Sequence, residues 1–157
     1  MKLIETWVKA PFLKGASLLL VSECAQSVYP EVYKRFMKER VVLTSCPEAE
    51  NAEMLMGKLA AILTCSDIKD LTVLTMEGSP HCLMLHAAAN EAMFITKAKV
   101  PFSHFVILNG KAIEVSSESV RVARYLHLVQ KCVQKCSDIL EDLNGLSLEH
   151  RCSRGRK

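Results

Sequence analysis

The sequence lacks the motifs that mark common nucleotide-binding and hydrolytic proteins. It contains no G-x-G-x-x-G or G-x-x-x-x-G-K-[ST] loop, so neither a dinucleotide site nor a P-loop is indicated. It has no G-x-S-x-G elbow and no H-E-x-x-H helix. Aromatic residues make up 6% of the chain and are scattered, which leaves no stacking platform for nucleic acid. The formal net charge of +3 is too small to indicate nucleic acid or an acidic membrane as a partner.

Long apolar runs are missing as well. The most apolar early segment, residues 16–21, is far shorter than the ~20 residues that a membrane span requires, and no secretory signal is recognised. We therefore expect a cytoplasmic protein with no membrane partner. The seven cysteines form no C-x-x-C pair, and an odd number without a signal argues against a disulfide framework. Reduced thiols, some of them holding a metal, are expected instead.

Short apolar runs alternate with helical patterns along most of the chain. Strands are predicted at residues 17–22, 41–45, 71–76 and 105–108. Helices are predicted at residues 25–39, 47–64, 80–97 and 116–143. This order predicts an α/β protein with a three-layer Rossmann-like or flavodoxin-like fold, a four-stranded mostly parallel sheet and a long C-terminal helix. Residues 1–145 are expected to form this single domain, and residues 146–157 a basic disordered tail.

The last predicted helix, residues 116–143, carries an apolar seam. Its apolar positions alternate by four and three along three heptads: Val122, Leu126, Val129, Val133, Cys136, Leu140 and Leu143. Packing of this helix on the sheet is the simpler interpretation. A homodimer formed through residues 116–143 is the alternative.

Three cysteines come after three successive predicted strands. Cys24 follows the first strand, Cys46 the second, and Cys82 the third after a short turn. In parallel sheets ligands bind outside the carboxyl ends of the strands, so neighbouring strands would bring these three thiols to one crevice. All three also lie at or near predicted helix N-termini, where the helix dipole favours the thiolate that binds iron or zinc. The pattern indicates a metal or iron–sulfur site, although a cysteine after a strand is also an ordinary small apolar residue.

An iron–sulfur or zinc site generally takes four ligands. His81 adjoins Cys82 and is the best candidate for the fourth, while His86 lies one helical turn further on. His104 is expected just before the fourth strand, at the end of the sheet opposite the crevice. An open fourth position is a further alternative. The predicted metal site consists of four residues: Cys24, Cys46, Cys82 and His81. Its expected cofactor is an iron–sulfur cluster, with zinc as the alternative.

The remaining candidates carry weaker signals. Cys132 and Cys136 are four residues apart and offer a metal-binding pair, but Cys136 is a seam position, so packing is favoured. Cys65 and Cys152 are taken as incidental. Glu23 and Glu77 are expected near the crevice, where solvated or capping carboxylates are common.

The segments around the three cysteines resemble a known family. They read Ser22-Glu23-Cys24-Ala25, Thr44-Ser45-Cys46-Pro47-Glu48 and Met76-Glu77-Gly78-Ser79-Pro80-His81-Cys82. They are similar to the cysteine-containing C-terminal domain of prokaryotic 4Fe–4S ferredoxin-type proteins, where the strands end in Asp-Cys-Val, Gly-Cys-Pro-Lys and Met-Glu-Val-Pro-Cys-Cys. The likeness spans roughly residues 9–113 and implies that the three cysteines correspond to those of the family. The ferredoxin module is absent, so the domain would stand alone, and His81 replaces the first of the paired cysteines.

The expected function is that of an iron–sulfur or other metal-binding accessory or electron-transfer protein with a redox protein as partner. One alternative is a thiol enzyme with a cysteine nucleophile at a helix start, for which Cys82 with His81 and His86 is the best candidate. The other is a non-catalytic dimeric scaffold. Nucleic acid is not an expected partner.

Overall fold

The computed structural model describes residues 1–154. By contacts between residues, the chain divides into two compact units between Ser117 and Glu118. Within the described residues, no helix combines the length and apolar character needed to cross a membrane.

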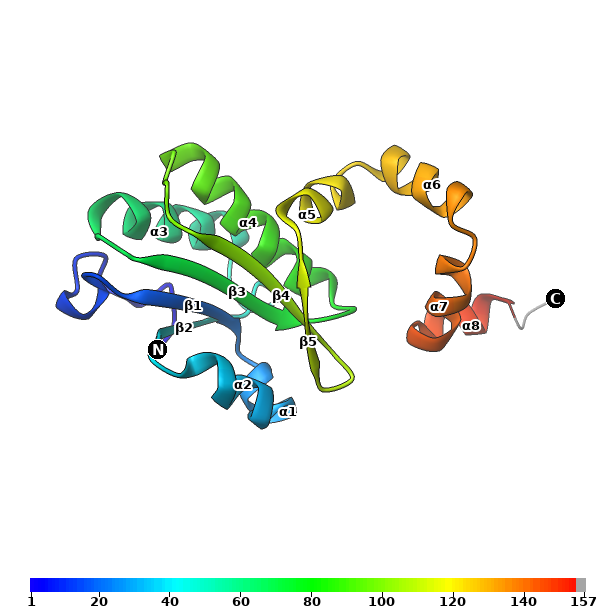
Figure 1. The fold of residues 1–157 in the computed structure, drawn as a ribbon, viewed down its shortest axis with the longest axis horizontal. Helices are drawn as coiled ribbons and strands as arrows, with labels where there is room; N and C mark the ends of the chain where they lie inside the picture. The colour runs from blue at the N-terminus through cyan, green and yellow to red at the C-terminus, as the bar shows by residue number, and fades with distance from the viewer. Residues whose placement is uncertain (155–157) are drawn as a thin grey trace. The chain divides into compact units, whose positions relative to one another are not determined.

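The first unit is a sheet with helices on both faces (Figure 1). Its strands are β1 (Ser17–Ser22), β2 (Val41–Ser45), β3 (Asp70–Met76), β4 (Phe102–Leu108) and β5 (Lys111–Val115). Its helices are a short 3-10 helix (Pro11–Leu13), α1 (Ala25–Val28), α2 (Pro30–Met37), α3 (Ala52–Cys65) and α4 (Pro80–Thr96). The strand order is β2-β1-β3-β4-β5, in which β1 to β4 run parallel and β5 runs antiparallel to β4. The predicted α/β Rossmann-like fold is confirmed.

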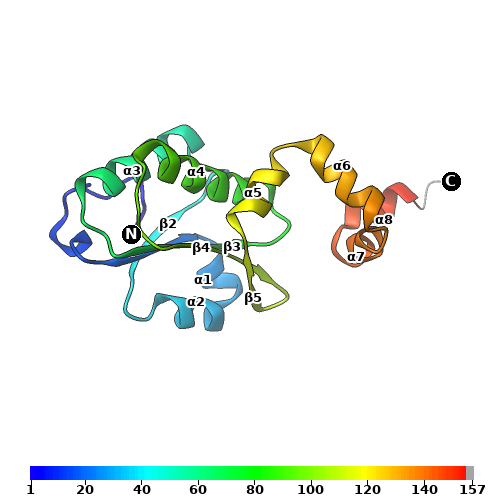
Figure 2. The same cartoon turned by 45° about the horizontal axis from the view of Figure 1, so that its top comes forward.

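The three layers follow from the burial of the central strands. β1 and β3 are buried on both faces, as expected of strands that read as continuous apolar runs. One face packs against α3 and α4 through side chains that include Leu20, Leu59 and Leu85. The other face packs against α1 and α2 through a smaller cluster that includes Leu19 and Val32. Figure 2 shows α3 and α4 on one side of the sheet and α1 and α2 on the other.

The sheet has a fifth strand that the sequence prediction missed. Asn109 and Gly110 both have positive φ, 49° and 76°, which is the backbone of a tight two-residue hairpin turn. This turn sends the chain back along β4 as β5 instead of ending the strand region. Asn-Gly between two apolar runs is the strongest short hairpin signal, so Asn109 and Gly110 already indicated a further antiparallel strand.

Two predicted helices have different bounds in the structure. The first is divided at Tyr29, whose backbone (φ −132°, ψ 65°) leaves the helical region because the residue before Pro30 is restricted. The second begins at Ala52 instead of residue 47. Asn51 is its N-cap, since the Asn51 Oδ1 accepts a hydrogen bond from the Met54 N–H at 2.9 Å.

The second unit consists of short helices. They are α5 (Ser117–Ala123), which begins at the boundary, α6 (Leu126–Lys135), α7 (Ile139–Leu146) and α8 (Leu148–Arg154). The predicted continuous helix 116–143 is therefore wrong. The chain leaves helical geometry at Tyr125 (φ −118°, ψ 89°) and at Cys136 (φ −124°, ψ 84°). Ser137 and Asp138, which follow the second break, have side chains that compete with the helix for backbone groups.

These breaks also affect the predicted dimer through the apolar seam. Three short helices do not present one continuous heptad stripe, so a dimer through a single long helix loses its geometric basis, and a homodimer as such stays an untested prediction. Leu126 and Leu143 of the expected seam are exposed. Helix α8 occupies residues 148–154, where a disordered tail was expected, and residues 155–157 lie outside the described part of the chain.

Candidate functional site

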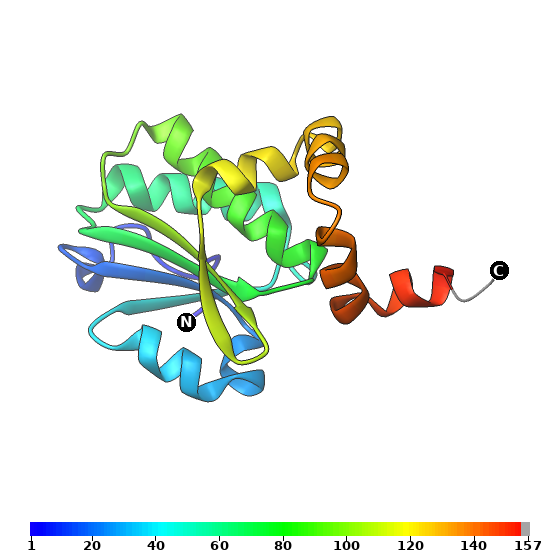
Figure 3. The same ribbon diagram turned by 45° about the vertical axis from the view of Figure 1, so that its right-hand side comes forward.

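The strand order brings the three cysteine-bearing strands together. β2, β1 and β3 are immediate neighbours in the sheet, as the three-cysteine interpretation requires. From the end of β1 the chain enters α1, and from the end of β3 it enters α4 on the opposite face (Figure 3). The strand order thus reverses between β1 and β3, and in open α/β sheets the crevice at such a point is the common ligand site.

The three thiols differ in exposure and local bonding. Cys24 is exposed, Cys46 is half-buried, and Cys82 is buried with 6% of its surface exposed. The Cys82 N–H is capped by the Ser79 Oγ at 3.4 Å, at the start of α4. All seven cysteines of the chain are free thiols. Within residues 1–154, no group of three or more His, Cys, Asp or Glu side chains is placed to hold a metal ion, so the structure does not gather the predicted ligands.

Carboxylates surround the same edge. The Glu50 Oε2 accepts hydrogen bonds from the Ser45 Oγ at 2.9 Å and from the Cys46 N–H at 3.0 Å. The Lys2 Nζ lies 3.3 Å from the Glu23 Oε1 and 3.9 Å from the Glu50 Oε1. The hydrogen bond to Glu23 and the charge of that carboxylate raise the pKa of the Lys2 ammonium.

Lys2 reaches this edge because the N-terminal segment extends the sheet. The Leu3 N–H donates to the Thr44 carbonyl oxygen, and the Thr44 N–H donates to the Met1 carbonyl oxygen, both at 2.8 Å. This parallel bridge places Lys2 beside β2. An ammonium group therefore lies between the two carboxylates that follow β1 and β2.

Two buried polar atoms at this edge have no hydrogen-bond partner among the described residues. They are the Ser22 Oγ and the Glu50 Oε1. Ser22 is 3% exposed and is the register partner of Ser45, whose hydroxyl binds Glu50. Buried polar groups are normally paired, and the Glu50 Oε1 has the Lys2 Nζ at 3.9 Å, so the Ser22 Oγ is the atom with capacity for a further bonding partner at the edge.

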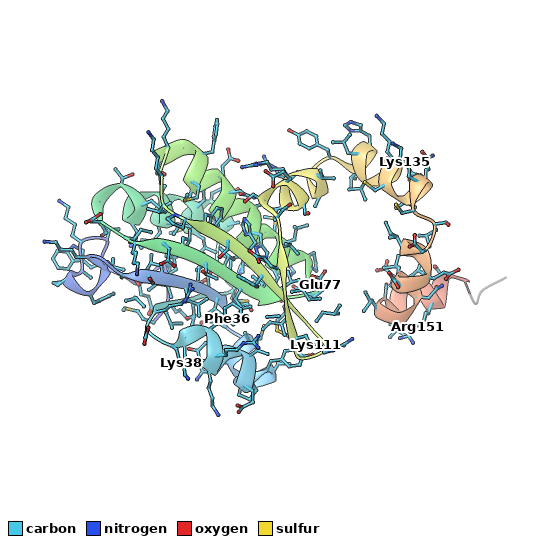
Figure 4. All side chains as sticks on the ribbon, viewed as in Figure 1. Phe36, Lys38, Glu77, Lys111, Lys135 and Arg151 are labelled. Carbon is cyan, nitrogen blue, oxygen red and sulfur yellow. The ribbon has the colours of Figure 1, made fainter. Side chains whose placement is uncertain are left out.

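His81 lies in the first turn of α4. Its side chain is 46% exposed, and its Nδ1 is 3.7 Å from the Glu48 Oε2 in the turn after β2. Glu77, labelled in Figure 4, follows β3 directly. The edge thus carries Glu23, Glu48, Glu50 and Glu77 together with one lysine and one histidine.

The structure corrects the places of the other two histidines. His104 lies inside β4, which begins at Phe102, and not before the strand. His86 is buried and faces the sheet, where its Nδ1 is 2.8 Å from the His104 Nδ1 and its Nε2 is 2.8 Å from the Thr75 Oγ1. His86 therefore takes part in a buried hydrogen-bond network and is not a ligand candidate at the crevice.

The direction of one hydrogen bond in this network follows from its last member. The Asn90 Oδ1, 3.4 Å from the His104 Nε2, can only accept, so the His104 Nε2 donates. Of the His86 and His104 Nδ1 atoms, 2.8 Å apart, one donates and the other accepts. Burial, and secondly the charge of His104, lower the pKa of His86 to about 3.

Sequence reasoning missed Lys2, Ser22 and Glu50 at the edge and the whole histidine network. Glu50 had a signal, since it stands four residues after Cys46 in the turn that precedes α3. His86 and Asn90 are also one helical turn apart on α4, and that spacing indicates a shared face. Nothing local indicated that Lys2 would pair beside β2.

The cysteine pair of the second unit is also placed differently from the expectation. Cys132 and Cys136 are both exposed, so the preference for packing at these positions is wrong. Cys132 lies within α6, and Cys136 follows the last residue of that helix.

Comparisons with known proteins place the chain in a family. Residues 10–141 match the Rossmann-like domain family. An uncharacterized protein of Archaeoglobus fulgidus is 29% identical over 119 residues, which covers 76% of this chain and 83% of that protein. No solved structure matches the chain. Neither match shows a link to ferredoxin-type proteins. Because the match spans most of its length, the chain belongs to the Rossmann-like domain family.

Proposed function

We propose that this protein binds an iron–sulfur cluster or another soft metal centre through Cys24, Cys46 and Cys82, and that it acts as an accessory or electron-transfer protein for a redox partner. The observation that carries the proposal is that three adjacent parallel strands, β2, β1 and β3, are each followed by one of these cysteines. Thiolates are the ligands that iron–sulfur clusters and soft metals prefer. The crevice at the reversal of strand order is the usual ligand site of such sheets.

The charges of the edge favour a cation over a nucleotide. In dinucleotide-binding sheets the pyrophosphate lies at the glycine-rich turn after the first strand. Here that turn contains Glu23 and no glycine, and Glu48, Glu50 and Glu77 add negative charge. A phosphate group would be repelled, whereas a metal ion would be attracted.

Thiolate and imidazole are suitable ligand types for such a metal. Their positions in the structure are not suitable, because the described side chains form no ligating group of three. Loading therefore requires side-chain rotation and movement of the turns. Cys24 is exposed and Cys46 half-buried, so their thiols have room to turn, whereas Cys82 is held in the first turn of α4. We infer that the metal collects the first two thiols around Cys82.

His81 is the proposed fourth ligand. Histidines that bind metals usually have a carboxylate or carbonyl beside the second ring nitrogen. Glu48 lies 3.7 Å from the His81 Nδ1 and supplies such a group, which leaves the Nε2 to bind the metal.

The test is metal and acid-labile sulfide analysis, with a visible spectrum, on the full chain purified without oxygen and reconstituted with iron and sulfide. We expect iron and sulfide in the parent protein and in Cys65→Ser, a control at another exposed thiol. Cys24→Ser, Cys46→Ser and Cys82→Ser should each lose the cluster while circular dichroism shows an intact fold. If all four variants retain the same iron and sulfide as the parent, or if the parent takes up none, the proposal is wrong.

The thiol-enzyme alternative is less well supported at Cys82. A nucleophile must be reached by its substrate, and Cys82 is only 6% exposed. A base must also lie beside it, and His86 is instead bonded to Thr75 and His104.

A further inference from the structure

A tandem repeat in the second unit places two thiols four residues apart, Cys132 within α6 and Cys136 directly after its last residue. The chain reads Val129-Gln130-Lys131-Cys132 and then Val133-Gln134-Lys135-Cys136, the same four residues twice. Four residues are close to one turn of helix, so the repeat places like residues about one turn apart, with Cys136 at the C-cap of α6. Both cysteines are exposed, and the Cys136 N–H still bonds the Cys132 carbonyl oxygen at 2.9 Å.

The two valines explain the repeat only in part. Val129 and Val133 are half-buried and form the apolar side of the helix. The cysteines contribute nothing to that side, because both are exposed to solvent. Two exposed thiols about one turn apart have the spacing of a chelating pair, and packing does not account for them.

The spacing suits a bridging ion better than a disulfide. The Cβ atoms of residues one turn apart lie about 5–6 Å from each other. A disulfide requires about 3.5–4.5 Å between its Cβ atoms. Two thiolates on one ion reach across the wider gap, because the ion adds two metal–sulfur bonds between the sulfur atoms.

The charged residues around the two cysteines indicate which kind of ion the pair would bind. Between residues 119 and 137 the sequence has four basic residues and no acidic one. Lys131 and Lys135, the latter labelled in Figure 4, directly precede the two cysteines. Zinc would need further ligands, and within the described residues no third His, Cys, Asp or Glu joins the pair. A soft monovalent ion needs two thiolates only, and the complex that it forms carries a net charge of −1.

We propose that Cys132 and Cys136 form a bidentate site for a monovalent thiophilic cation, Cu(I). Two thiols and one Cu(I) give a bis-thiolate complex of charge −1 and release two protons, with no change of oxidation state. The lysines stabilise the negative complex. This site is independent of the cluster proposed for the first unit, which lies in an acidic environment and uses different cysteines.

The test is an anaerobic Cu(I) titration of the full chain in competition with a Cu(I) chelator. To separate the two sites, the titration uses a background in which Cys24, Cys46 and Cys82 are all serine. In that background we expect one Cu(I) to bind, with two sulfur atoms on copper by X-ray absorption. Cys132→Ser and Cys136→Ser should each weaken binding by about 100-fold or more, since a chelate becomes a single ligand.

The control is Cys65→Ser in the same background, which should leave the affinity unchanged. Equal affinities in the Cys132→Ser, Cys136→Ser and parent proteins would overturn the proposal, as would an equal loss in Cys65→Ser. If the triple-serine background does not fold, single Cys132→Ser and Cys136→Ser variants of the native chain must each bind one copper fewer than Cys65→Ser. An equal copper count in all three would refute the site.

Discussion

Acidification should destabilise this protein through His86. The side chain is 2% exposed and lies between Thr75 and His104, so burial disfavours its charged form. Its pKa falls from the ordinary 6.5 to about 3 in the folded state. Between these values the unfolded chain binds a proton that the folded chain does not. The contribution of neutral His86 to the free energy of unfolding is therefore fully present above about pH 6.5, and it is lost progressively as the pH falls toward 3.

The magnitude follows from the same values. At pH 5 the unfolded imidazole is protonated and the folded one is still neutral. The pH is then about 1.5 units below 6.5, and at about 1.36 kcal/mol per unit the loss is about 2 kcal/mol. This is a large share of the 5–15 kcal/mol that holds a typical domain folded, so the effect is within reach of denaturant titration.

The assay is urea unfolding at pH 7.5 and pH 5 for the parent and for His86→Gln, which removes the titrating ring and keeps a polar group toward Thr75. The parent should lose about 2 kcal/mol more than His86→Gln over this interval, whatever the variant costs at pH 7.5. The matched control is His127→Gln, at an exposed position in α6, which should keep the pH dependence of the parent. The reasoning fails if the parent and His86→Gln respond equally to pH, or if the His86 ring titrates near 6.5 by NMR.

Three further predictions concern single positions. Asn51→Ala should lower the free energy of unfolding by about 1 kcal/mol by removing the N-cap of α3, while Asn51→Asp keeps the acceptor and should change it little. Gly57→Ala, with no atom near the added Cβ in α3, should stabilise by about 0.5–1 kcal/mol, whereas Gly110→Ala at φ +76° should destabilise by about 1 kcal/mol. Thermal or urea unfolding at neutral pH measures all four, and a reversed sign for either glycine would contradict the assigned backbone. For the proposed metal site, His81→Cys should retain iron after anaerobic reconstitution and His81→Ala should lose part of it, and equal iron in the two would remove His81 from the site.

The sequence by itself determined the four parallel strands and the edge at which the chemistry is expected. Short apolar runs such as residues 17–22 and 71–76 are buried on both faces, so their composition alone indicates parallel central strands. Cys24 and Cys46 stand directly after such runs, and a residue that follows a parallel strand lies at the carboxyl edge in any strand order. The sequence also contained the hairpin signal at Asn109 and Gly110. The prediction missed β5 because this signal indicates a hairpin only when the apolar runs on both sides of it are considered together.

Only the tertiary structure decided which side chains meet. The order β2-β1-β3 depends on how the helices cross the sheet, and the residues of β1 to β3 are compatible with several orders. Lys2 meets Glu23 and Glu50 through pairing across more than forty residues, which no local pattern encodes. The long apolar repeat of residues 116–143 forms three helices instead of one. Periodicity indicates which positions are apolar, but it does not indicate whether a partner surface exists to stabilise one long helix.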